Sequence, residues 1–255
     1  MAGNDVRSRV QAVETTLDII EFLHEQDGAT IETIAANVGV GTSTVHRHLV
    51  TLGERNYVVR IDGSYHLSFK FLTHGGKVRN RVSHDELIVN KLHQIVDETG
   101  ERVQFIIEEQ GQRVYVFTYA GPSAVRTDAT IGKRGPLHVS AAGKSILAYL
   151  PDERVTEILD DLSTDGPTDN SITDRDRLET ELQEIRERGY AFNDQESTTG
   201  LRAVGVPIRY DDGQVLGAIS ISGPANRLKG TYFREELPDL LLGAVNEIEL
   251  NVKFS

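Results

Sequence analysis

The side chains with the clearest chemistry in this sequence lie in residues 42–53. This segment includes Ser43, Thr44, His46 and Arg47 and has no Asp or Glu, in a chain with 39 acidic residues against 27 Lys and Arg. Hydroxyl groups bind phosphate oxygens, and an arginine fork pairs with the major-groove edge of guanine. The pattern is therefore typical of a surface that contacts DNA.

Two short helices are expected to position these side chains. Thr30 can cap the first, whose apolar residues keep helical spacing as far as Val38, and Gly39 is free to take the positive φ of a tight turn. Thr42 or Ser43 is expected to cap the second helix, residues 44–52. Three of its apolar residues fall at i, i+4 and i+7 and form one buried stripe: Val45, Leu49 and Leu52.

A β-hairpin is expected to follow these helices. Two β-prone runs, residues 57–61 and 64–67, are joined by Asp62-Gly63, a strong two-residue hairpin signal. Arg60 near this wing and Ser64 beside its tip would reach the DNA backbone. With an amphipathic helix over residues 10–23 behind it, this order of elements predicts a winged helix-turn-helix. Helical hairpins also occur in proteins that never bind DNA, so the assignment depends on the acid-free outward face.

Composition excludes several other classes of protein. The 255 residues, 38% of them hydrophobic, suit one large or two small domains. A chain without Cys has no disulfide, thiolate zinc site or cysteine nucleophile, and Gly143-Lys144-Ser145 lacks the upstream Gly of a phosphate loop. No run approaches the ~18 apolar residues of a membrane span, and the first residues lack a signal-peptide pattern. We expect a cytoplasmic protein that is not an enzyme and holds no metal or cofactor.

The charge is unevenly distributed along the chain. The formal net charge is −12, but residues 1–80 hold 8 Lys and Arg against 9 Asp and Glu, so nearly all of the excess acid lies in residues 81–255. Only 7 of the 27 basic residues are Lys. This composition suggests a halophilic protein. At ~1 M salt the screening length is only ~3 Å, so the excess acidic side chains repel one another little. Full stability in dilute buffer would contradict that hypothesis.

The rest of the chain predicts a second domain of mixed structure. Residues 69–76 are expected to be a short connector before a helical pattern from residue 78 that ends at Gly100. Strands are expected over 103–108, 113–119, 125–131, 204–209 and 215–222, and helices over 141–150, 155–162, 178–185 and 238–252. This order indicates an α+β fold with a mostly antiparallel sheet flanked by helices. The predicted domains are residues 8–76, a linker helix over 77–100, and residues 101–255.

Four further motifs stand in a distinctive order in the second half: Gly135-Pro136-Leu137-His138 with Ala141-Ala142-Gly143-Lys144, Glu187-Arg188-Gly189-Tyr190, Gly200-Leu201-Arg202, and Ser220-Ile221-Ser222-Gly223-Pro224. Together with residues 42–49, they give a chain that resembles the IclR family of transcription regulators over nearly its whole length. The resemblance implies a GAF-like effector-binding domain, homodimers or dimers of dimers, and control of genes for using a carbon source.

The same resemblance implies an effector pocket lined by Ala141, Ala142, Asn193, Asp194, Ala203, Ser220 and Ser222. The residues themselves agree in part, because Ser220 and Ser222 are two apart on one strand and face the same side. Backbone N–H groups at a helix start over residues 140–143 would suit a carboxylate or hydroxyl oxygen. Without the resemblance, the two serines alone favour a solvated strand face. Family members commonly have Cys in place of Ala203, which puts that ligand contact in doubt.

We therefore expect a ligand-responsive regulator that binds double-stranded DNA through Thr42, Ser43, Thr44, His46, Arg47, Arg60 and Ser64. A symmetric dimer would read a near-palindromic operator with half-sites ~34 Å apart. A sugar, sugar acid or aromatic acid would be the small-molecule effector. Two alternatives remain: a second domain that only dimerises, or an enzyme with a fused helix-turn-helix.

Overall fold

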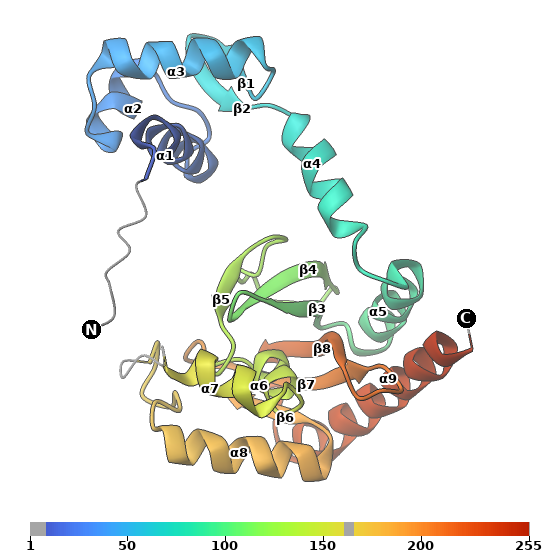
Figure 1. Cartoon of the computed structure of the whole chain (residues 1–255). Coiled ribbons are helices and arrows are strands. Elements are labelled where there is room, and N and C mark those ends of the chain that lie inside the picture. Colours follow the sequence, from blue (N-terminus) through green and yellow to red (C-terminus); the bar gives the residue numbers. More distant parts are fainter. Residues whose placement is uncertain (1–8, 161–165, 255) are drawn as a thin grey trace. The chain divides into compact units, whose positions relative to one another are not determined.

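The computed structural model describes residues 9–160 and 166–254 and divides into two compact units after Val82 (Figure 1). The predicted domain start at residue 8, and residues 161 and 162 at the end of the helix predicted over 155–162, lie outside the described part. Within the described residues, no helix has the length and apolar character needed to cross a membrane.

The first unit has the expected order of a winged helix-turn-helix: α1 (Gln11–Glu25), α2 (Ile31–Val38), α3 (Thr42–Glu54), β1 (Val58–Ile61), β2 (Ser64–Leu67) and α4 (Lys70–Arg79). Thr30 caps α2 by accepting a hydrogen bond from the Thr33 N–H, and Gly39 ends α2 with φ 74°. Asp62 and Gly63, with φ 50° and 89°, form the hairpin turn between β1 and β2. The prediction of this fold is confirmed.

The start of α3 differs from the sequence prediction. Gly41 occupies the N-cap position without a side-chain hydrogen bond, so neither Thr42 nor Ser43 caps the helix; both lie in its first turn. The buried stripe is as expected, because Val45, Leu49 and Leu52 are at most 7% exposed and pack in a core with α1, α2 and β1.

The predicted connector and linker helix are wrong. Residues 69–76 lie largely in α4, and residues 77–100 do not form one helix, because His84 takes φ 59° and α5 (Asp85–Thr99) begins after it. Gly75 and Gly76 have poor helix propensity, but contacts with Tyr57 fix α4. The Tyr57 ring stacks on His74 at 5.6 Å, its hydroxyl shares a 3.0 Å hydrogen bond with His74 Nε2, and Phe71 packs edge-on against the ring.

The second unit is built on a six-stranded sheet in which every neighbouring pair is antiparallel, in the order β5-β4-β3-β8-β7-β6. The strands are β3 (Arg102–Glu109), β4 (Gln112–Ala120), β5 (Arg134–Pro136), β6 (Ala191–Asp194), β7 (Leu201–Arg209) and β8 (Val215–Pro224). The predicted α+β fold with a mostly antiparallel sheet is confirmed.

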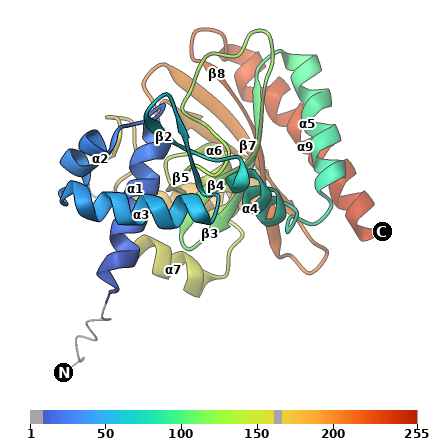
Figure 2. The same cartoon turned by 90° about the horizontal axis from the view of Figure 1, so that it is seen from above.

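Helices cover both faces of this sheet (Figure 2). On one face α5 and α9 (Leu237–Lys253) lie side by side, and a π-helical turn, η1 (Tyr232–Glu236), precedes α9. On the other face lies α6 (Ala141–Leu147), which packs in one core with α7 (Asp152–Asp160) and α8 (Arg175–Arg188).

Three predictions for this unit need correction. Residues 125–131 form no strand; the turn after them, held by the Gly132 N–H bonded to the Tyr115 carbonyl, leads instead into β5. The edge strand β6 was not predicted; it is defined by its antiparallel pairing with β7. Helix α6 ends at Leu147, well before Pro151.

Substitution of one core residue of α3 tests this packing. Leu49 is 1% exposed and its neighbour Val50 is 44% exposed. Leu49→Ala is expected to lower the free energy of unfolding by about 2–5 kcal/mol, because it leaves a cavity in a close-packed core. Val50→Ala is the matched control and should change it by less than about 0.5 kcal/mol. Urea titrations followed by circular dichroism measure both, and equal effects would contradict the assigned packing.

Candidate functional sites

The first candidate site is the outward face of α3. Thr42, Ser43, His46 and Arg47 are exposed and Thr44 is half-buried, while the opposite side of the helix is buried in the core. The exposed Arg60 on β1 lies 5.6 Å above the ring of Tyr65, and Ser64 is half-buried at the start of β2. The structure thus places the predicted DNA-contacting residues of α3 on one surface and the other two on the hairpin.

His48 has a different role from its neighbour His46. It is half-buried, and its Nδ1 shares a 2.8 Å hydrogen bond with Thr16 Oγ1 of α1. This bond helps to fix α3 on α1. Among the described residues, no group of three or more His, Asp and Glu could hold a metal ion.

The second candidate site is a cavity of about 510 Å³ between the sheet and the start of α6. Its floor is polar, because Gln104 on β3 faces Ser220 and Ser222 on β8, and all three are buried. Ser220 Oγ donates a 3.0 Å hydrogen bond to Gln104 Oε1, and Ser222 Oγ donates a weaker one at 3.4 Å. The two serines are therefore not a solvated strand face.

Six of the seven residues predicted for the effector pocket line this cavity: Ala141, Ala142, Asn193, Ala203, Ser220 and Ser222. The side-chain amide of Asn193 is already used within the turn after β6. Its Nδ2 donates to Ser197 Oγ at 2.7 Å, and its Oδ1 accepts from the Glu196 N–H at 2.8 Å. The amide of Asn193 thus holds Ser197 and Glu196 in place at the cavity wall.

Asp194 is the exception, because it does not line the cavity. Its carboxylate accepts from Arg202 Nε at 2.7 Å and lies 3.5 Å from Arg234. Partial burial raises the pKa of Asp194, but hydrogen bonds from Arg202 and Gln195 outweigh that effect, so the pKa is lowered. Asp194 is best described as part of an ion-pair group beside the cavity.

The sequence prediction missed several residues that line the cavity: Gln104, Arg113, Tyr115, Arg126 and Asp128, with residues 197–201. Gln104 carried a usable signal, since it is a single amide between the apolar Val103 and Phe105 of a strand. Arg113 brings a cation to the cavity wall. Its Nη1 donates to the Pro136 carbonyl at 2.6 Å, while its buried Nε has no hydrogen-bond partner among the described residues.

A glycine allows the start of α6 to lie directly on the sheet. A Cβ added to Gly205 of β7 would come within 2.5 Å of the Ala142 nitrogen. Ser140 caps α6 by accepting a 3.1 Å hydrogen bond from the Gly143 N–H. Together, these contacts fix the wall that Ala141 and Ala142 contribute to the cavity.

Adding a methyl group at Gly205 tests how closely the start of α6 approaches β7. Gly205→Ala is expected to lower the free energy of unfolding by about 1–3 kcal/mol, because backbone atoms must move to admit the methyl group. In the control Gly243→Ala, on α9, the added carbon meets no atom within 4 Å, so stability should hold or rise by up to about 1 kcal/mol. Denaturant unfolding compares the two, and a harmless Gly205→Ala would contradict the close approach.

Comparison with known proteins matches both units to one family. The model for the IclR helix-turn-helix domain matches residues 12–62, and the model for the C-terminal domain of the bacterial transcriptional regulator IclR matches residues 85–250. A probable HTH-type transcriptional regulator ArcR of Halobacterium salinarum is 29% identical, over 99% of this chain and 97% of that protein. An acetate operon repressor of Salmonella typhimurium is 28% identical, over 96% of this chain and 91% of its own. The crystal structure of the Thermotoga maritima IclR superposes with a TM-score of 0.83 at 28% identity, covering 96% of this chain and 99% of that one.

Proposed function

Because the chain belongs to the IclR family of transcriptional regulators, we propose that it binds operator DNA through α3 and responds to a small molecule held in the cavity. The observation that carries the proposal is the outward face of α3: residues 42–53 have no acidic side chain, and the other side of the helix is buried. As a DNA-binding regulator it would act in the cytoplasm.

On the DNA side, each predicted contact residue suits one kind of DNA contact. The hydroxyls of Thr42, Ser43 and Thr44 lie in the first turn of α3, where they suit phosphate oxygens, and His46 and Arg47 suit base edges in the major groove. Arg60 and Ser64 on the hairpin suit the adjacent backbone. A homodimer, or a dimer of dimers, would read a near-palindromic site with half-sites ~34 Å apart.

Removal of the Arg47 guanidinium tests whether α3 contacts bases. Arg47→Ala is expected to weaken binding to a duplex selected from random DNA by the wild-type protein by about 1–3 kcal/mol and to relax sequence choice at one base pair. Arg177→Ala removes the same charge from the exposed face of α8 and serves as the control. Gel-shift titrations at one fixed salt concentration measure both variants, because affinity for DNA depends on salt. Unchanged binding by Arg47→Ala would remove this residue from the interface.

On the ligand side, the cavity offers groups for an oxygen-rich molecule. Ser220, Ser222 and Gln104 supply hydroxyls and an amide, and Arg113 supplies a cation for an acid. Such a site suits a sugar, a sugar acid or an aromatic acid, and the acetate operon repressor among the relatives supports control of a carbon-source operon.

Thermal denaturation of the full chain with glucose, gluconate and 4-hydroxybenzoate tests the ligand site. A ligand at ~100-fold over its Kd should add ~2.7 kcal/mol to the free energy of unfolding. Ala203→Leu places a larger side chain at the cavity wall, so it should remove the stabilisation by the same ligand. If no small molecule of these classes shifts the melting temperature, the second unit does not sense them. A shift that persists in Ala203→Leu would place the ligand elsewhere.

A further inference from the structure

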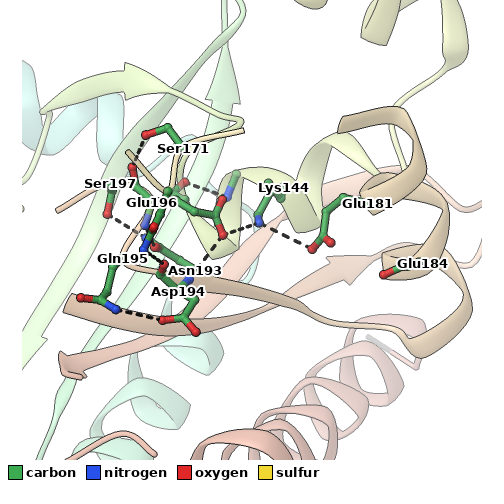
Figure 3. Close-up of polar contacts among 12 residues, drawn as sticks. Lys144, Ser171, Glu181, Glu184, Asn193, Asp194, Gln195, Glu196 and Ser197 are labelled. Carbon is green, nitrogen blue, oxygen red and sulfur yellow. Dashed lines mark hydrogen bonds and ion pairs between the residues drawn. The ribbon is translucent and has the colours of Figure 1, made fainter. Parts of the chain in front are cut away.

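A buried ion pair lies behind one wall of the cavity. Lys144 reaches from α6 to Glu196 in the turn that joins β6 to β7, and its Nζ lies 2.7 Å from Glu196 Oε1 (Figure 3). The two side chains are only 1% and 9% exposed. Neither residue lines the cavity, but each belongs to an element that does. The start of α6 contributes Ala141 and Ala142. The segment 193–200, which is the end of β6 with the turn after it, contributes Asn193 and residues 197–200.

Other charged groups lie on the far side of this pair. Lys144 Nζ is 3.5 Å from Glu181 of α8 (Figure 3). Glu181 also accepts a 2.8 Å hydrogen bond from Arg188 of the same helix. Glu196 Oε1 also accepts a 3.3 Å bond from the Asp194 N–H, whereas its buried Oε2 has no partner among the described residues. One of the two carboxylate oxygens is thus left unsatisfied.

The pair is a poor source of stability. Burial raises the pKa of Glu196, and the attraction of Lys144 offsets only part of that effect. A carboxyl whose pKa is raised by folding makes the folded state less stable as the pH rises through that pKa. A buried pair with an unsatisfied oxygen is also often replaceable by neutral residues at little cost. Its main effect is therefore on geometry.

A short chain of hydrogen bonds leads from Glu196 to the cavity. The Glu196 N–H donates to Asn193 Oδ1 at 2.8 Å, and Asn193 Nδ2 donates to Ser197 Oγ at 2.7 Å. Asn193 and Ser197 both line the cavity. The outer side of the turn is fixed separately, because Ser171 Oγ donates to the Glu196 carbonyl at 2.7 Å and Thr168 Oγ1 donates to the Gln195 carbonyl at 2.8 Å. The ion pair connects the turn to α6.

We propose that the Lys144–Glu196 ion pair positions the turn of residues 193–200 against α6 and thereby sets the affinity of the cavity for its ligand. This inference rests on the proposed ligand-binding role of the cavity. Lys144 and Glu196 are positioning residues in it, and they touch no ligand themselves.

A neutral replacement of the whole pair separates positioning from stability. Lys144→Met/Glu196→Gln keeps the size of both side chains and leaves no buried charge unpaired, so the melting temperature should stay near that of the wild type. Amide hydrogen exchange of residues 193–200 in the ligand-free full chain should lose most of its protection, with β3 and β8 unchanged. If only a tenth of the molecules keep the turn in place, the Kd for whichever of glucose, gluconate or 4-hydroxybenzoate binds the wild type should rise about tenfold.

The exposed pair Arg175 and Glu179 on α8 provides the control. Arg175→Met/Glu179→Gln removes the same charges and should change neither exchange nor affinity. Wild-type exchange in residues 193–200 of the Lys144→Met/Glu196→Gln variant, or a wild-type Kd, would overturn the proposal. If that variant does not fold, Glu196→Gln alone is measured in the same way, and unchanged exchange contradicts the proposal equally. If the wild type binds none of the three compounds, the proposed function fails, while the exchange measurement still decides the role of the pair.

Discussion

The organisation of the second unit follows from the cost of removing polar groups from water. One face of β3 and β8 carries Gln104, Ser220 and Ser222 inside the protein, and a buried amide or hydroxyl without a partner costs about 1–3 kcal/mol. The two serines meet this requirement by donating to a single oxygen of Gln104. The same face is covered only partly by α6, so these groups border a cavity and can exchange partners with a bound molecule. The opposite face, which α5 and α9 cover, has the apolar Val103 and Phe105.

In the first unit, apolar and polar side chains lie on opposite faces of one helix. In α3 the helical period places Val45, Leu49 and Leu52 in the core and leaves hydroxyl, imidazole and guanidinium groups in solvent. The core then fixes the orientation of the helix, while the exposed groups need no internal partner. The hydrogen bond between His48 and Thr16 adds a specific contact between α3 and α1. A surface built in this way presents its polar groups on a rigid support.

Local patterns predicted most of the fold, and contacts between distant residues account for the failures. The helical period of α3, the hairpin turn at Asp62 and Gly63, and the paired strands of the sheet are all properties of short segments. In contrast, α4 depends on its contacts with Tyr57, and β6 depends on its pairing with β7. The hydrogen bonds of the Asn193 amide depend on Ser197 and Glu196. Six pocket residues came from family resemblance rather than from physical reasoning. Gln104 was missed because the meaning of one amide in an apolar strand depends on which side chains face it across the sheet.

The contacts of Tyr57 have a mechanical consequence for the first unit. Tyr57 follows α3 after only two residues and packs against His74 and Phe71 of α4. Lys70 Nζ of α4 also donates a hydrogen bond to the carbonyl of Arg55, at the end of α3. These contacts connect α4 directly to the end of α3, past the hairpin that separates them in the sequence. A torque applied to α4 would turn α3 with it, so the orientation of α3 would follow any force that the following residues exert on the chain at residue 80.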